Sequence, residues 1–410
     1  MHRRGFLATL GMLGLAGCAG LRYWPDEGLW NRCVNGRMPE ALAQHDLVQA
    51  AWQGLDTAQV WDCHTHLIGT GDSDSGIWVN PNMESPLHLF QYVQFKFYLN
   101  AACAGTAKSI DQGYVQRLVK LNQGMASGVK FMLLAFDYHY DEKGGRVLEN
   151  SPFYTPNDYA ASVANQYPEN FEWIASIHPY REDCVEALEQ VVAAGARAVK
   201  WLPGSMGMNP ASPLCDRFYA ALRRLNIPLL IHAGTEYAVH VDGLQGYGNP
   251  LLMRRPLDLG IRVIVAHCAS LGRSIDIDKG ANRKGSPEVD NFELFARLMS
   301  EPAYVDLLYG DIAAVTQVNR DVSIISRIIQ NLDWHDRLIN GSDYPLPGVM
   351  PVFSMRQYVN SGLLPESEAK LISAVREYNP MLFDFILKRR IQVDGKRLPN
   401  RVFESRRLFI

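Results

Sequence analysis

Short apolar runs alternate with amphipathic stretches along most of this chain. The runs are four to eight residues long and apolar on both faces, as in strands buried on both sides of a parallel sheet. The stretches between them repeat with the 3.6-residue period of helices. Eight strands are therefore predicted, at residues 59–66, 129–136, 172–178, 197–202, 227–232, 262–267, 303–308 and 337–343.

This alternation of strands and helices predicts an α/β fold, a TIM-type (β/α)8 barrel with a C-terminal helical extension. We place the barrel domain at residues 57–388. A long insertion follows the first strand, at residues 67–128, and is a candidate lid because long loops at this position often carry function. No Gly-rich nucleotide loop follows a predicted strand, which argues against a dinucleotide-binding fold.

The first residues have the pattern of an export signal. The positive segment MHRR precedes the apolar segment GFLATLGMLGLAG, which is too short for a membrane-spanning helix. The sequence LAGC, ending at Cys18, resembles a bacterial lipoprotein box, and RRGFL resembles a twin-arginine signal. We predict a signal peptide at 1–17, lipidation of Cys18 and an N-terminal extension at 18–56. Sec and twin-arginine export both remain open.

The expected location follows from this signal. A lipidated Cys18 would anchor the protein to a membrane of the bacterial cell envelope. We expect the periplasmic side of the outer membrane in preference to the inner membrane.

Composition and charge narrow the class of partner. The chain of 410 residues is 47% hydrophobic and 20% charged, with a formal net charge of -3. It lacks the overall basic character of nucleic-acid-binding proteins, so we expect a small-molecule substrate and no nucleic acid. The segment 389–410 is locally basic and is predicted to be a solvated tail on the outside of the barrel. The oligomeric state stays open.

Seven cysteines are present, and Cys18 is assigned to the lipid anchor. The other six allow fifteen full pairings, so the sequence selects no disulfide. Cys63 and Cys268 adjoin candidate metal ligands, and we interpret both as small packing residues of the core.

Candidate chemistry gathers at the ends of the predicted strands, where barrel enzymes have their active sites. Asp62, His64 and His66 alternate along the first strand and should share the face toward the barrel interior. A buried cluster of imidazoles and a carboxylate needs a compensating charge, which a divalent cation supplies. We therefore predict a metal site formed by His64, His66, Lys200, His232, His267 and Asp343.

With these motifs in this order, the chain resembles the amidohydrolase superfamily. It is most similar to the amidohydrolase-related branch of metal-dependent hydrolases and decarboxylases. The matching motifs are DCHTH on the first strand, GARAVKWLP on the fourth, IPLLIHAG on the fifth, IRVIVAHCASLG on the sixth and NGSDYP on the eighth. REYNPMLFDF resembles the closing helix of the family.

The resemblance implies one of two metal centres. In a dinuclear centre, His64, His66 and Asp343 hold the first metal. A carboxylated Lys200 then bridges to a second metal, which His232 and His267 hold.

In a mononuclear centre, one metal is held by His64, His66, His232 and Asp343. His267 then acts on water or substrate, and Lys200 stays an ammonium group that balances a carboxylate or binds an anion. The expected cofactor is one or two divalent metals per chain, zinc first and manganese second.

The reaction implied is metal-dependent hydrolysis. A metal-bound hydroxide attacks the carbonyl of a lactone, ester or amide, and Asp343 and His267 are the expected catalytic residues. His139 and His178 follow the second and third strands and are predicted to contact substrate; Glu236, Tyr237 and His240 could also line the mouth.

Two other functions stay open. The first is a mononuclear-metal, non-oxidative decarboxylase of an organic acid. The second, of a different class, is a non-catalytic envelope lipoprotein that uses the barrel as a binding scaffold.

Overall fold

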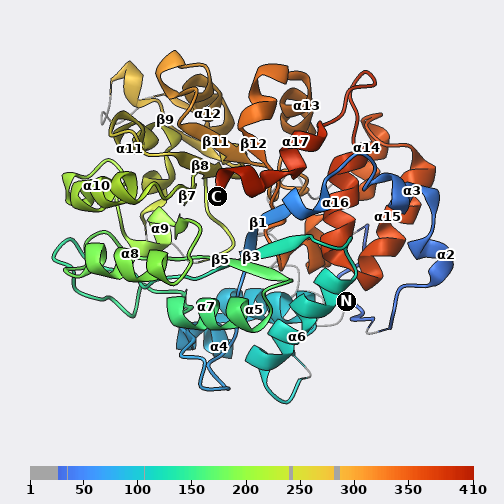
Figure 1. The fold of residues 1–410 in the computed structure, drawn as a ribbon, viewed down its shortest axis with the longest axis horizontal. Helices are drawn as coiled ribbons and strands as arrows, with labels where there is room; N and C mark the ends of the chain where they lie inside the picture. The colour runs from blue at the N-terminus through green and yellow to red at the C-terminus, as the bar shows by residue number, and fades with distance from the viewer. Residues whose placement is uncertain (1–25, 35, 106, 240–242, 281–286) are drawn as a thin grey trace.

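A ring of parallel strands forms the centre of the computed structural model, which describes residues 26–34, 36–105, 107–239, 243–280 and 287–410 (Figure 1). The signal peptide, Cys18 and His240 lie outside the described residues. The strands of the ring are β1 (Trp61–His66), β3 (Lys130–Leu134), β5 (Phe171–Ile174), β6 (Val199–Trp201), β7 (Leu229–His232), β8 (Val263–Ala266), β11 (Leu308–Asp311) and β12 (Leu338–Ile339).

Two sheets close into a barrel at two seams. Strands β1, β3 and β5 form one parallel sheet, and β6, β7, β8, β11 and β12 form the other. At the first seam, Ala175 N donates to Ala198 O over 2.9 Å. At the second, Cys63 N donates to Asn340 O over 3.1 Å, and Thr65 pairs in parallel with Tyr344. The predicted (β/α)8 fold is confirmed.

Helices follow the strands around the outside, as Figure 1 shows. Each helix buries one side. In α10 (Asp216–Leu225), Phe218, Tyr219 and Leu222 are buried, and Asn226 ends the helix with φ 56°. The helices between strands are α7 (Asn157–Gln166), α8 (Cys184–Ala193), α10 (Asp216–Leu225), α11 (Arg254–Asp258), α12 (Asn291–Met299) and α13 (Val322–Gln330). The C-terminal extension adds α14 (Met355–Asn360), α15 (Glu366–Tyr378) and α16 (Pro380–Arg390).

The seventh barrel strand lies later in the chain than predicted. Residues 303 and 304, expected at the start of the strand, belong to the 3-10 turn Pro302–Tyr304, and the strand itself is Leu308–Asp311. Gly310 lets this strand approach its neighbours, since a Cβ there would lie 2.8 Å from Cys268 Sγ. The strand ends at Asp311.

The insertion at 67–128 contains β2 (Trp78–Val79), α4 (Pro81–Glu84), α5 (Leu89–Ala101) and α6 (Ile110–Gln123). Strand β2 pairs antiparallel with β4 (Phe153–Tyr154). From α5, Gln94 Nε2 donates to Tyr237 O over 2.7 Å, and Tyr98 Oη donates to Ala238 O over 2.5 Å. The insertion is therefore fastened to the loop that follows β7.

A disulfide joins Cys33 to Cys103 and ties the N-terminal extension to the insertion. The extension also contains two short helices, α2 (Glu40–Ala43) and α3 (Asp46–Ala50). The remaining cysteines of the described residues are free and buried: Cys63, Cys184, Cys215 and Cys268.

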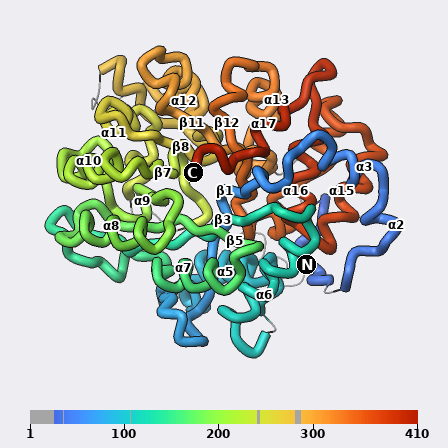
Figure 2. Tube along the Cα trace, viewed as in Figure 1, coloured from blue at the N-terminus to red at the C-terminus, as the bar shows by residue number. Residues whose placement is uncertain are grey.

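The C-terminal segment closes the barrel, which corrects the expectation of a solvated tail. Helix α17 (Asn400–Phe403) leads into the last residues, which end near the centre of the strand ring (Figure 2). Leu408 and Phe409 are buried in one cluster with inward-facing side chains such as Met132 and Ile264. Although the segment is rich in basic residues, its apolar end is buried against the interior of the barrel.

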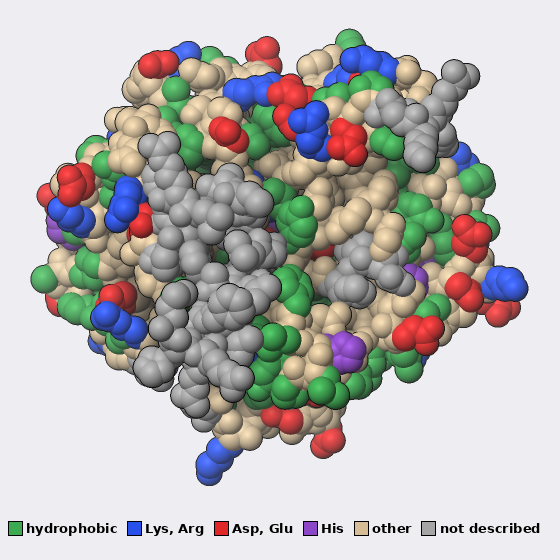
Figure 3. All heavy atoms as spheres, turned by 180° about the vertical axis from the view of Figure 1, so that it is seen from behind, with side chains coloured by type: hydrophobic (Ala, Val, Ile, Leu, Met, Phe, Trp, Pro, Cys, Tyr) green, Lys and Arg blue, Asp and Glu red, His purple; other side chains and the backbone are tan. Residues whose placement is uncertain are grey.

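The face seen from behind Figure 1 carries acidic and basic side chains of both signs around its rim (Figure 3). Within the described part of the chain, no helix is long and apolar enough to cross a membrane.

Candidate metal centre

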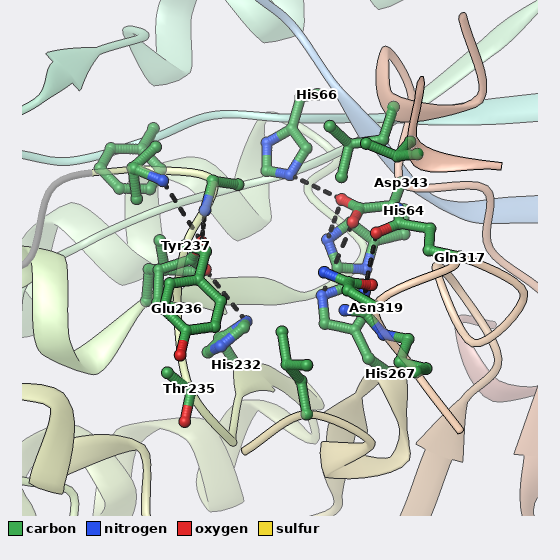
Figure 4. Close-up of a pocket in the computed structure, with 18 of the residues that line it drawn as sticks. His64, His66, His232, Thr235, Glu236, Tyr237, His267, Gln317, Asn319 and Asp343 are labelled. Atoms are coloured by element: carbon green, nitrogen blue, oxygen red, sulfur yellow. Dashed lines mark hydrogen bonds and ion pairs between the residues drawn. The ribbon is translucent and has the colours of Figure 1, made fainter. Parts of the chain in front are cut away.

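A buried cluster of histidines and carboxylates lies at the carboxyl end of the barrel strands. Figure 4 shows His64, His66 and Asp343 together, with His267 beside them and His232 across the cavity. Asp343 Oδ1 lies 3.2 Å from His66 Nε2 and 3.5 Å from His64 Nε2. These three residues offer ligand atoms within 4.8 Å of one another, as a single cation requires.

His64 is oriented by Asp311. Its Nδ1 donates to Asp311 Oδ2 over 2.9 Å, so the lone pair of Nε2 faces Asp343. Asp311 Oδ1 also accepts the backbone N–H of His267 over 2.7 Å. Such a carboxylate behind a histidine ligand fixes its tautomer. Asp311 was not among the predicted site residues because the seventh strand was expected to end at residue 308.

His267 is held in the same way by a backbone carbonyl. Its Nδ1 lies 3.1 Å from Ala313 O, which can only accept, so Nδ1 carries the proton. Its unprotonated Nε2 lies 3.8 Å from Asp343 Oδ2. The ring centroids of His267 and His64 are 4.9 Å apart.

His232 and Lys200 complete the predicted set. Both ring nitrogens of His232 are buried and have no hydrogen-bond partner among the described residues, although Glu236 Oε2 lies 3.4 Å from Nδ1. Lys200 Nζ lies 3.2 Å from His64 Nε2 and is buried. Five of the six residues predicted as ligands therefore line one cavity, and the sixth, Lys200, contacts His64 without lining it.

Burial sets the charges of these groups. It lowers the pKa of His66, of His232 and of His267, the last to about 3, so the imidazoles are neutral and able to bind a metal. Burial alone would raise the pKa of Asp343, but the surrounding histidines lower it well below its ordinary value. Burial also lowers the pKa of Lys200.

A polar wall follows β11. Arg320 and Gln317 lie in the loop before α13 and line the same cavity as His64 and Asp343. Burial lowers the pKa of Arg320 to about 10, so the guanidinium is charged at neutral pH. Neither residue was predicted, although the rule that barrel sites form after strand ends would have pointed to this loop.

Two predicted substrate contacts lie elsewhere. His139 Nδ1 is 3.0 Å from Ser205 O, and His178 Nε2 is 2.8 Å from Met206 O. Neither side chain lines the cavity of the metal centre. Both histidines bind the backbone after β6, so the structure gives them a local structural role.

Asp62 also departs from expectation. Its carboxylate accepts the backbone N–H groups of His64 and Ser342, over 3.0 and 2.9 Å, and does not join the cluster. The pairing of β1 with β3 shifts register between Asp62 and Thr65, which breaks the alternation that the prediction assumed.

Solved structures of similar fold include a probable 2-pyrone-4,6-dicarboxylic acid hydrolase from Acinetobacter baumannii, with citric acid bound. It shows 15% identity and a TM-score of 0.44, over 76% of this chain and 95% of that chain. An uncharacterized TIM-barrel protein from Bordetella bronchiseptica shows 16% identity and a TM-score of 0.44, over 76% and 93%.

A third is 5-carboxyvanillate decarboxylase from Novosphingobium aromaticivorans, a mutant with bound manganese. It shows 10% identity and a TM-score of 0.41, over 79% of this chain and 96% of that chain. At these identities and TM-scores, none of the three structures indicates the reaction or the substrate of this chain.

The family is shown by sequence. No curated protein matches the chain. The sequence model of the amidohydrolase family, however, matches residues 61–352, the span that contains every predicted ligand. The chain belongs to the amidohydrolase family and is a metal-dependent enzyme of that type.

Proposed function

We propose that this enzyme hydrolyses a C–O or C–N bond at a carbonyl carbon, in a lactone, an ester or an amide. The observation that carries the proposal is the convergence of His64, His66 and Asp343 in a buried cavity at the carboxyl end of the barrel. An ionised carboxylate among neutral imidazoles suits both a cation and a proton transfer.

The residues fit a divalent cation. His64 presents the unprotonated Nε2 to the cavity because its Nδ1–H donates to Asp311 Oδ2. The unpartnered nitrogens of buried His232 would be costly unless one of them binds a ligand. His64, His66, His232 and Asp343 would hold one cation, and Lys200 and His267 would join for a second. Zinc is our first choice and manganese our second.

When bound, the cation supplies Lewis acidity, which lowers the pKa of water and polarises a carbonyl. Asp343 would accept the proton of the attacking water and pass it to the leaving group. His267 would orient the water by accepting its hydrogen bond at Nε2, which lies 3.8 Å from Asp343 Oδ2.

A non-oxidative decarboxylase of an organic acid is the second candidate. The cationic side chain of Arg320 in the same cavity supports it, because a guanidinium suits a carboxylate. This reaction would need one cation and an unmodified Lys200.

The deciding experiment is the metal content per chain, by elemental analysis of a soluble form that starts after Cys18. Two metals, with the second lost in Lys200→Ala, would support a dinuclear hydrolase with carboxylated Lys200. One metal, with carbon dioxide released from organic acids and no acid released from ester or lactone panels, would support the decarboxylase. No metal, even after reloading with zinc or manganese, would contradict both and leave the binding scaffold.

We further propose that the protein is exported and anchored to the cell envelope through Cys18. The disulfide between Cys33 and Cys103 supports this, because disulfides persist in oxidising compartments. Cys18→Ala should release the protein from the membrane fraction. Retention of the variant in that fraction would contradict the lipid anchor.

A further inference from the structure

A second cavity adjoins the metal centre on the side of the insertion. We call it the apolar chamber. His66 and Asp343 border both the chamber and the metal cavity, so the two are continuous at the predicted ligands. The other walls of the chamber are almost entirely apolar and include Ile77, Val79, Met83 and Phe95, all buried.

The chamber is formed by parts of the chain that are held in place. Phe95 belongs to α5, which donates hydrogen bonds to the loop after β7 through Gln94 and Tyr98. Ala238 and Val239 of that loop line the chamber. An apolar group beside His66 would therefore enter a preformed space, where burial of its surface is favourable.

The polar wall of the metal cavity has the opposite character. Arg320 is only 8% exposed, and its guanidinium donates to the neutral oxygens Ser270 Oγ, Gln317 Oε1 and Asn319 Oδ1, over 3.1, 2.7 and 2.6 Å. The hydrogen-bond partners of this guanidinium among the described residues are thus all uncharged, and the carboxylates of Asp343, Glu236 and Asp311 act on it only through longer-range electrostatics. A buried cation that lacks an adjacent anion is costly, and an anionic ligand would compensate it.

Gln317 adds an independent observation. Its Oε1 accepts from Arg320, which fixes the amide, and its Nε2 is buried with no hydrogen-bond partner in the part of the chain that the structure describes. Figure 4 places Gln317 beside Asp343 and His64. A guanidinium and an unsatisfied amide N–H in one wall match the oxygens of a carboxylate.

We propose, resting on the function above, that the substrate is an amphipathic carboxylic acid. Arg320 and Gln317 bind its carboxylate, its apolar arm occupies the chamber beneath the insertion, and the reacting carbonyl lies between them at His66 and Asp343. Neither Arg320 nor Gln317 borders the chamber, so the two ends of the substrate meet different walls.

Binding of unreactive probes tests this without any turnover. The probes are acetate, butanoate, hexanoate and octanoate with the uncharged primary alcohols of the same chain lengths, titrated calorimetrically into zinc-loaded protein. Chelator-treated protein is titrated in parallel, so that a carboxylate bound to zinc is recognised. We expect the affinity of the acids to rise about fourfold for each added methylene until the chamber is full. Affinity independent of chain length would overturn the apolar arm.

Two substitutions separate the two ends. Arg320→Met should weaken binding of the acids about 10- to 100-fold and leave binding of the alcohols within about twofold, with part of the loss restored in Arg320→Lys. Equal weakening of acids and alcohols would overturn the carboxylate contact. Val79→Phe should remove the gain per methylene and spare acetate. Arg327→Met, which removes an exposed guanidinium on α13, is the matched control and should change nothing.

These outcomes are independent of the proposed reaction. If the probes bind as expected and no ester, lactone or amide is hydrolysed, the substrate class stands and the hydrolytic function fails. If hydrolysis is found and binding of the probes does not depend on charge or length, the hydrolytic function stands and the proposed substrate class fails.

Discussion

The carboxylate of Asp311 holds two histidines of the metal centre at once. Its Oδ2 accepts from His64 Nδ1 over 2.9 Å, and its Oδ1 accepts from the backbone N–H of His267 over 2.7 Å. His64 lies within β1 and His267 follows β8, so one buried carboxylate at the end of β11 sets the direction of His64 and the position of His267.

Replacement of Asp311 by Asn should therefore weaken metal binding. The amide can accept from only one of these donors through its single oxygen, and loss of such a supporting contact costs about 10- to 100-fold in metal affinity. The measurement is zinc affinity by competition with a chromogenic chelator. Asp306→Asn, an exposed aspartate just before the strand, is the control. Equal zinc affinity in both variants would show that Asp311 does not support the ligand.

Replacement of Asp343 by Asn should slow turnover more than it weakens metal binding. An amide still offers an oxygen to a cation but cannot accept a proton, and loss of a general base costs on the order of 10²- to 10⁴-fold. The measurement is the rate of acid release from the ester and lactone panel, with metal content determined on the same sample. Unchanged turnover with metal retained would refute Asp343 as the base.

The sequence predicts most of the fold and ligand set because both depend on local rules. Apolar runs mark buried strands, and His232 and His267 stand at or next to strand ends where a barrel collects its chemistry. Asp311 was not predicted because the expected strand, residues 303–308, begins within the turn Pro302–Tyr304 and ends before the observed strand Leu308–Asp311 does. Local rules cannot place such a boundary.

Other features depend on contacts distant in sequence. The barrel is filled at its base by Leu408 and Phe409, although the surrounding residues are basic. The pairing of Cys33 with Cys103 depends on the packing of the extension against α5, which no spacing rule reveals. Arg320 and Gln317 lie in a loop, where periodicity carries no information about the direction of a side chain.

Acid should lower the stability of the loop after β8, because it protonates the carboxylate of Asp276. Two hydrogen bonds from Arg297, each 2.7 Å long, lower the pKa of Asp276 from 3.8 to about 2. A carboxylate with a lowered pKa stabilises the fold above its unfolded pKa, and this stability is lost as the pH falls through about 2. Asp276→Asn should therefore be less stable than wild type at pH 6, with the difference shrinking between pH 4 and pH 2.

Thermal unfolding of both proteins across this pH range is the measurement. Asp290→Asn, at an exposed carboxylate 3.6 Å from Arg273, serves as the control and should match wild type throughout. A difference between Asp276→Asn and wild type that stays constant down to pH 2 would show that the contact with Arg297 does not set the acid stability.

The disulfide between Cys33 and Cys103 should stabilise the wall of the apolar chamber. It closes a loop with a sequence separation of 70 and joins the extension to the segment directly after α5, the helix that contributes Phe95 to the chamber. The double variant Cys33→Ser and Cys103→Ser should lose about 2–4 kcal/mol of unfolding free energy, since cross-links over long loops constrain the unfolded chain.

Because α5 also fastens the loop after β7, hydrogen exchange should rise at Tyr98 and Ala238 before it rises in the barrel strands. Cys184→Ser, at a buried free thiol on the far side of the barrel wall, controls for loss of a sulfur alone. If hydrogen exchange rises equally in the barrel strands and in the insertion, the disulfide stabilises the whole barrel and not the chamber in particular.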